Sequence, residues 1–195
     1  MIKIGLTGSI GMGKSTTAQM FAAHGIPVHD ADAAVHRLYE GSAVPLISDA
    51  FPGTVVDGKV DRTLLSKQVL GNPEAMKRLE EIVHPLVHEE ERTFLDLVRL
   101  DGHSMVLLDI PLLFETGAEA RVDVIVVVTA DADIQRERVL SRQGMTTERF
   151  EAILKKQVPD AEKREKADFL IDTGLGFEAA EQRVAEILQE LGERV

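Results

Sequence analysis

Short apolar segments alternate along the chain with longer stretches in which hydrophobic residues recur at helical spacing. The segments that predict buried strands are Ile2–Thr7, Ile26–Val28, Met105–Asp109, Val122–Thr129 and Phe169–Asp172. Residues 122–128 are almost all Val and Ile, which is typical of a strand buried on both faces of a parallel sheet. The stretches that predict helices are Lys14–Gly25, Glu74–Leu100, Asp131–Arg142, Thr147–Gln157 and Phe177–Leu191.

Alternation of strand and helix predicts an α/β domain, with a five-stranded parallel sheet flanked by helices in three layers. Residues from about 33 to 103 contain no convincing sheet strand, so we interpret them as a helical insertion between the second and third strands. A single domain over 1–195 then has its core at about 1–32 and 104–195. An insertion of this size in a small α/β enzyme usually shapes the pocket of a second substrate.

The amino-acid composition indicates a protein with a buried core and argues against several kinds of partner. The chain has 195 residues, of which 44% are hydrophobic, so it can bury a core. Its net charge of −11 (22 basic against 33 acidic residues) argues against nucleic acid or an anionic membrane as a partner. Cysteine is absent, and no stretch approaches the roughly 18 apolar residues of a membrane helix. We expect a cytoplasmic protein, and a monomer, with an oligomer left open.

The segment Gly8–Ser15 fits the pattern G-x-x-x-x-G-K-[ST] in full, between a predicted strand and a predicted helix. Glycines let successive N–H groups converge on phosphate oxygens, and the helix adds the positive end of its dipole. Lys14 can reach the β- and γ-phosphates, and Ser15 can ligate Mg²⁺. The predicted ATP contacts are Gly8, Ser9, Ile10, Gly11, Met12, Gly13, Lys14, Ser15, Thr16 and Arg142. The fold is therefore predicted to be that of the P-loop NTPases.

Two further elements suit phosphoryl transfer. Met105–Asp109 is an apolar strand that ends in a carboxylate, so Asp109 could bind Mg²⁺ directly or through water, although an aspartate there is also a common turn residue. Arg138 and Arg142 are four apart on a predicted helix and share one face, as in a short lid at about 136–150 that closes over phosphates. Ion pairs with Glu137 and Asp133 on a solvated helix are the alternative interpretation.

Asp30 and Asp32 follow the second predicted strand, at the end of the sheet where ligands of α/β proteins bind. One carboxylate there could accept a proton from an attacking hydroxyl group. Either could instead cap the helix predicted at Ala33–Tyr39, and one of the two is expected to do so.

An ordered set of motifs resembles the dephospho-CoA kinase family over essentially the whole chain. The motifs are Ile4–Thr7 with the phosphate loop, Asp30-Ala31-Asp32, Asp61-Arg62, His84-Pro85, Asp109–Glu115, Gln135-x-x-Arg138-x-x-x-Arg142, Gln157, Lys163 and Ala167-Asp168. The resemblance implies transfer of the ATP γ-phosphoryl group, with Mg²⁺, to the 3′-hydroxyl of dephospho-CoA.

By matching positions, the resemblance implies that Asp32 is the general base, Lys14 the phosphate clamp, and Arg138 and Arg142 the lid arginines. It implies Ser15 as a magnesium ligand, beside Asp109, the metal-ligand candidate at the end of the strand Met105–Asp109. The residues implied for the acceptor pocket are Asp32, Arg62, His84, Leu112, Leu113 and Phe114, with Glu115. Two positions depart from the family pattern: His36 stands where an arginine is frequent, and Thr173 stands where an asparagine is frequent beside the adenine.

Two other functions remain as alternatives. A kinase for another small acceptor, such as a nucleotide, shikimate or gluconate, would also suit a phosphate loop followed by Asp-x-Asp, but the later motifs fit it poorly. A nucleotide-dependent switch ranks third, because a guanine switch needs Asn-Lys-x-Asp and the chain's only asparagine, Asn72, precedes a proline.

Overall fold

The computed structural model describes residues 1–193, so residues 194 and 195 of the predicted domain lie outside the described part. The chain forms two compact units, which divide at Asp30 and Leu97. The sheet unit consists of Met1–His29 and the chain from Val98 onward, and the insertion unit is Asp30–Leu97. Each unit has its own hydrophobic core.

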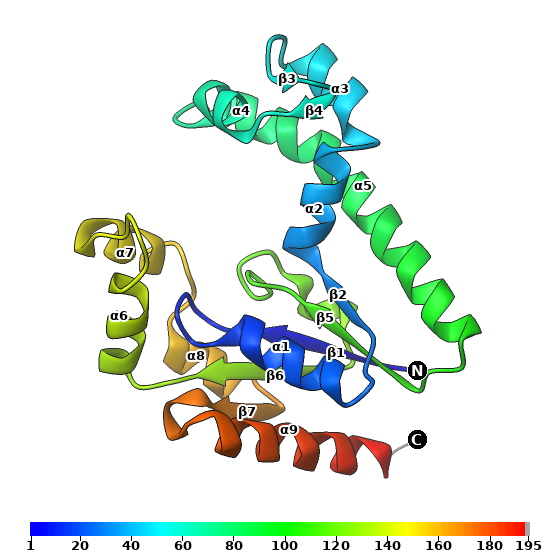
Figure 1. The fold of residues 1–195 in the computed structure, drawn as a ribbon, viewed down its shortest axis with the longest axis vertical. Coiled ribbons are helices and arrows are strands. Elements are labelled where there is room, and N and C mark those ends of the chain that lie inside the picture. The colour runs from blue at the N-terminus through cyan, green and yellow to red at the C-terminus, as the bar shows by residue number, and fades with distance from the viewer. Residues whose placement is uncertain (194–195) are drawn as a thin grey trace. The chain divides into compact units, whose positions relative to one another are not determined.

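Over the described residues, a five-stranded parallel sheet has the order β2-β5-β1-β6-β7, which confirms the predicted fold class (Figure 1). Its strands are β1 (Ile2–Thr7), β2 (Val28–Asp30), β5 (Met105–Asp109), β6 (Val124–Thr129) and β7 (Phe169–Asp172). The predictions for β1, β5 and β7 are confirmed at both ends. The second strand begins at Val28 rather than Ile26, because Pro27 has no N–H to donate to a ladder, although its carbonyl accepts from the Leu107 N–H.

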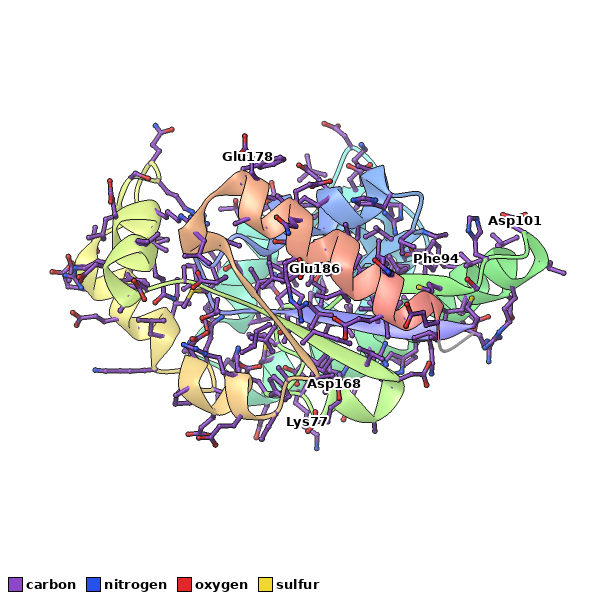
Figure 2. The ribbon with its side chains drawn as sticks, turned by 90° about the horizontal axis from the view of Figure 1, so that it is seen from below. Lys77, Phe94, Asp101, Asp168, Glu178 and Glu186 are labelled. Atoms are coloured by element: carbon purple, nitrogen blue, oxygen red, sulfur yellow. The ribbon has the colours of Figure 1, made fainter. Side chains whose placement is uncertain are left out.

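Helices α1 and α9 pack against the sheet and bury a hydrophobic core with it. The helices of this unit are α1 (Lys14–Ala23), α6 (Ala132–Leu140), α7 (Thr147–Leu154), α8 (Asp160–Glu165) and α9 (Phe177–Gly192), with short 3₁₀ turns at Ala118–Arg121 and Thr173–Leu175. Helix α9 buries Ala180, Val184, Ile187 and Leu191 along one face. Glu178 and Glu186 of the same helix are exposed (Figure 2). The short helix α8 was not predicted.

The insertion unit is mainly helical, but it also contains a small hairpin that the sequence analysis missed. Its elements are α2 (Ala31–Tyr39), α3 (Ala43–Ala50), β3 (Val55–Val56), β4 (Lys59–Val60), α4 (Arg62–Val69) and most of α5 (Pro73–Leu100). Asp57 and Gly58 both have positive φ, as the tight turn between two antiparallel strands requires. An Asp-Gly pair flanked by valines is a hairpin signal that could have been recognised. Among the described helices, none has the length and apolarity to cross a membrane.

A buried ion pair ties the loop after β5 to α8. Lys163 is fully buried, and its Nζ lies 2.9 Å from Oε1 of Glu115, which also accepts the Val158 N–H at 2.8 Å. Burial raises the pKa of the Glu115 carboxyl, but the hydrogen bonds from Lys163 and the backbone, together with the Lys163 charge, outweigh it and leave that pKa below its ordinary value. Glu115 therefore has a structural partner of its own.

Removal of Lys163 should destabilise the fold. In Lys163→Met the carboxylate of Glu115 loses its buried partner, and we expect a loss of about 3 kcal/mol in the free energy of unfolding at neutral pH, measured by urea denaturation. The double variant Lys163→Met/Glu115→Gln should recover part of this loss. Lys77→Met is the matched control, because the exposed Lys77 (Figure 2) pairs with the equally exposed Glu81 one turn along α5.

The pair should also show in the pH dependence of stability. Because the folded pKa of Glu115 is lowered, its stabilisation is fully present above the ordinary glutamate pKa and disappears as the pH falls through the folded value. Acid should therefore destabilise the parent protein more than the double variant. Equal acid sensitivity of the two proteins would contradict the assignment.

Candidate active site

The phosphate loop lies between β1 and α1, and its glycines leave no room for side chains. A Cβ at Gly8 would lie 2.7 Å from the Val128 carbonyl oxygen. Gly11 has φ +80°, and a Cβ there would lie 2.4 Å from Cγ2 of Val139. The loop therefore closes against β6 and α6 as bare backbone. Gly13 leads into α1 with no side-chain cap, so the N-terminal amides of that helix face the loop and favour an anion.

Lys14 and Asp109 form an ion pair that joins the phosphate loop to the end of β5. The register of β1 against β5 places Leu6 opposite Asp109, which brings the strand ends together. Both side chains are largely buried, with 15% of Lys14 and 5% of Asp109 exposed. Ser15 and Thr16 follow at the exposed start of α1. A cation, a carboxylate and a hydroxyl group thus meet at one loop.

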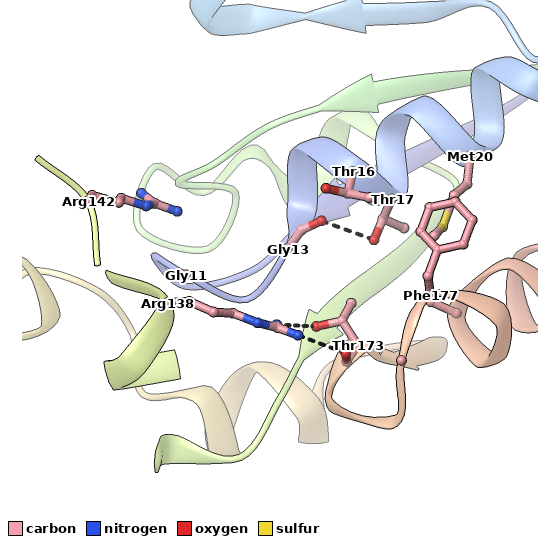
Figure 3. Close-up of a pocket in the computed structure, with 11 residues that line it drawn as sticks. Gly11, Gly13, Thr16, Thr17, Met20, Arg138, Arg142, Thr173 and Phe177 are labelled. Carbon is pink, nitrogen blue, oxygen red and sulfur yellow. Dashed lines mark hydrogen bonds between the residues drawn. The ribbon is translucent and has the colours of Figure 1, made fainter. Parts of the chain in front are cut away.

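A pocket of about 370 Å³ opens beside the loop (Figure 3). It is lined by Gly11, Gly13, Thr16, Thr17, Met20, Arg138, Arg142, Thr173, Gly176, Phe177 and Ala180. The polar lining comes from the loop, α1 and the two arginines, and the apolar lining comes from Met20 and the start of α9. This combination suits a ligand that has both a flat apolar part and phosphates.

The two predicted lid arginines both line this pocket, but they do not share a helix face. Helix α6 ends at Leu140, and Arg142 lies in the turn that follows, where its N–H donates to the Val139 carbonyl at 3.1 Å. Arg138 donates to Oγ1 of Thr173 at 2.8 Å and to the Thr173 carbonyl at 2.9 Å. These bonds, rather than an ion pair along the helix, orient its guanidinium group.

Thr173 is not among the predicted ATP contacts, but it lines the pocket. Its Oγ1 accepts from Arg138 (Figure 3) and donates to the Met12 carbonyl at 2.8 Å, so one hydroxyl group links Arg138 to the phosphate loop. The sequence did mark this position, as a departure from the family pattern after the last strand. It gave no signal for Phe177, which is 64% exposed and lines the pocket.

In the insertion unit, the structure decides which aspartate caps α2. Asp30 accepts the Ala33 N–H at 2.9 Å as the N-cap, while Asp32 is exposed in the first turn. The carboxylate of Asp32 is therefore not used in capping. Near it in sequence, Nε2 of His36 lies 2.6 Å from a guanidinium nitrogen of Arg62, so His36 accepts and Arg62 donates.

The other residues implied for the acceptor pocket differ in accessibility. His84 is exposed on α5, and Leu112 is 43% exposed. Leu113 is fully buried, and its Cδ1 lies 2.9 Å from where a Cβ on Gly5 would be, so it packs against strand β1 instead of facing solvent. Phe114 is 9% exposed, with the Lys166 ammonium 5.4 Å from its ring centroid. Leu113 and Phe114 thus serve the core of the sheet unit.

A sequence model of the family described as dephospho-CoA kinase matches residues 2–177. The chain belongs to the dephospho-CoA kinase family. A dephospho-CoA kinase of Mesorhizobium japonicum is 63% identical over 98% of this chain and 97% of its own length. A dephospho-CoA kinase from Agrobacterium fabrum is 61% identical over 98% of this chain and 99% of its own length.

Solved structures agree with this family membership. A protein of Thermus thermophilus superposes with a TM-score of 0.84 at 36% identity, over 97% of each chain. Dephospho-CoA kinase from Campylobacter jejuni superposes with a TM-score of 0.74 at 26% identity, over 98% of this chain and 97% of its own chain. A shikimate kinase from Bacteroides thetaiotaomicron, at 0.53 and 18% identity over 98% of each chain, shares the fold alone.

Loss of the Thr173 hydroxyl should weaken nucleotide binding. Thr173→Val keeps the side-chain shape but removes the acceptor of Arg138 and the donor to the phosphate loop. We expect a threefold to tenfold rise in the Kd of a fluorescent ATP analogue, of the order of one or two hydrogen bonds. Thr93→Val, which removes an exposed hydroxyl bond on α5, is the matched control. Unchanged affinity in Thr173→Val would contradict the role assigned to this hydroxyl group.

Proposed function

We propose that this chain transfers the γ-phosphoryl group of ATP to the 3′-hydroxyl of dephospho-CoA, which gives coenzyme A and ADP. The observation that carries the proposal is the Lys14–Asp109 pair at a complete phosphate loop, in a chain that belongs to the dephospho-CoA kinase family. The 63% identity to a dephospho-CoA kinase over nearly both whole chains supports the same acceptor. A cytoplasmic monomer, as expected from the sequence, is part of the proposal.

The phosphate loop would hold the β- and γ-phosphates through its backbone amides, the amino end of α1 and the Lys14 ammonium. The donor set at the loop also fits Mg²⁺, because this ion prefers oxygen ligands and the Ser15 hydroxyl and Asp109 carboxylate supply them. Mg²⁺ held by these two residues would neutralise negative charge on the phosphates during transfer. Lys14 would exchange its contact with Asp109 for the phosphates.

The pocket beside the loop would take the adenosine of ATP. The exposed ring of Phe177 and the side chain of Met20 offer an apolar surface to the base, and Arg138 and Arg142 offer planar cations to the phosphates. Closure of these arginines over the phosphates would exclude water, which otherwise competes with the acceptor hydroxyl.

Asp32 is the residue we propose as the general base. It would take the proton from the 3′-hydroxyl while that oxygen forms its bond to the γ-phosphorus and the bond to the bridging β–γ oxygen breaks, so that ADP leaves. Its exposure, with Asp30 as the cap, supports this role. On the acceptor side we propose Arg62, His84 and Leu112, with the buried side chains of Leu113 and Phe114 anchoring the segment that carries Leu112.

The acceptor is tested by comparing dephospho-CoA with adenosine, AMP, shikimate and gluconate, with ATP and Mg²⁺ present. We expect rapid ADP release with dephospho-CoA alone, and a product of increased mass that carries the new phosphate at the 3′ position. Turnover of another acceptor only would overturn the proposed substrate and keep the phosphoryl-transfer chemistry. No turnover with any acceptor would overturn the assignment as a kinase.

The base is tested with Asp32→Asn, which keeps the size of the side chain but cannot accept the proton. We expect kcat to fall by about 10²–10⁴, with the Kd for ATP within about twofold of the parent. Asp49→Asn on α3 is the matched control for loss of an exposed carboxylate in the same unit. Normal kcat, or loss of ATP binding with normal turnover of bound substrate, would exclude Asp32 as the base.

A further inference from the structure

Two glutamines bind the backbone of one residue of the phosphate loop, Ile10, at its N–H and at its carbonyl. The Ile10 N–H donates to Oε1 of Gln157 at 3.1 Å, and Nε2 of Gln135 donates to the Ile10 carbonyl at 2.7 Å. Because a backbone N–H can only donate and a carbonyl can only accept, these partners fix which way each side-chain amide is turned. Ile10 is thus held by Gln135 as donor and by Gln157 as acceptor.

The two glutamines bracket the segment that carries the pocket arginines. Gln135 lies in α6, three residues before Arg138, and Gln157 follows α7. The chain between them, which includes Arg138 and Arg142, therefore leaves the phosphate loop and returns to it at the same residue. Ile10 and Gln157 are 147 positions apart in sequence, so no local preference produces this contact.

Both ends of this segment are held in place by packing or by hydrogen bonds to the rest of the sheet unit. At the first end, α6 packs directly on the loop, since a Cβ on Gly11 would lie 3.1 Å from the Gln135 carbonyl oxygen as well as against Val139. At the second end, the residue after Gln157 donates its N–H to Glu115, which pairs with buried Lys163. Asp160 further accepts from Oγ1 of Thr129 at 2.7 Å, which fixes α8 to the end of β6.

We propose that Gln135 and Gln157 are positioning residues that couple the arginine-bearing segment to the phosphate loop. They touch no reacting atom. They hold the backbone of Ile10 in the conformation that shapes the loop for phosphates, and they keep both ends of the segment 136–156 against that loop. The inference rests on the proposed kinase function for its catalytic consequences, and on nucleotide binding alone for the rest.

Loss of either bond should have two effects. The loop would have to be ordered by the nucleotide itself, which weakens binding by about threefold to tenfold for one hydrogen bond. The arginines would also close less accurately, so water would reach the γ-phosphate and ADP would form without acceptor phosphorylation. A residue that served folding only would lower stability without changing the ratio of ADP released to acceptor phosphorylated.

The first test uses Gln135→Met and Gln157→Met, which keep the side-chain length and remove the hydrogen bonds. We expect each to raise the Kd of a fluorescent ATP analogue and the KM for ATP threefold to tenfold, and to raise the ratio of ADP to phosphorylated acceptor above that of the parent. Gln182→Met is the matched control, because it removes an exposed amide bond to Glu186 on α9. Affinity and ratio within twofold of the parent in both variants would overturn the proposal.

The second test makes one substitution at both positions. In Gln157→Glu the carboxylate still accepts the Ile10 N–H, whereas in Gln135→Glu it faces the Ile10 carbonyl with no proton to donate. Both variants add the same negative charge near the loop, so that charge cancels in the comparison. We expect Gln157→Glu to bind the ATP analogue at least threefold more tightly than Gln135→Glu. Equal affinities, or the reverse order, would overturn the positioning role proposed for Gln135 and Gln157.

These readouts separate the positioning role of the two glutamines from the proposed function. Binding of the ATP analogue needs no acceptor, so the order of the two glutamate variants tests the positioning role even if the parent protein does not phosphorylate dephospho-CoA. In that case the proposed function would be wrong, and the affinities of the glutamate variants would still decide the positioning role. If a methionine variant lacks cooperative unfolding, the pair of glutamate variants decides the outcome.

Discussion

A phosphate loop must present bare backbone to an anion, and the rest of the sheet unit is arranged around that constraint. Gly8 and Gly11 have no side chains because β6 and α6 occupy the space where a Cβ would be. The same closeness lets side chains from distant segments reach the loop's peptide groups: Thr173 reaches Met12, and Gln135 and Gln157 reach Ile10. The loop is held from outside, which leaves its inner face for phosphates.

Charge is concentrated where the chemistry needs it. The chain as a whole carries a net charge of −11, which would repel a polyphosphate at long range. Lys14, Arg138 and Arg142 offset this locally, and Lys14 and Arg138 are kept in position by their partners. Asp109 faces Lys14, and the neutral hydroxyl and carbonyl of Thr173 orient Arg138 without cancelling its charge. Because its acceptors are neutral, Arg138 keeps its positive charge for interaction with an anion.

The two units divide the tasks of the proposed reaction. The sheet unit holds the nucleotide groups, and the insertion unit holds Asp32, Arg62 and His84 on helices that have a core of their own. In that unit a capping interaction decides a chemical role, because Asp30 uses its carboxylate on the Ala33 N–H and Asp32 does not. Likewise, Glu115 is engaged with buried Lys163, which makes it a support for the loop after β5 and not a free carboxylate.

The amino-acid sequence by itself determined the strands β1, β5 and β7, the parallel α/β architecture, the phosphate loop and the family. These follow from local patterns: short apolar segments, helical spacing, and glycines, lysine and serine at fixed offsets. Tertiary structure alone decided that Arg142 lies beyond its helix, that Leu113 is buried, that Thr173 meets Arg138 across 35 positions, and that Gln157 meets Ile10. Such contacts depend on how the sheet order brings distant segments together, and periodicity along one segment carries no information about that.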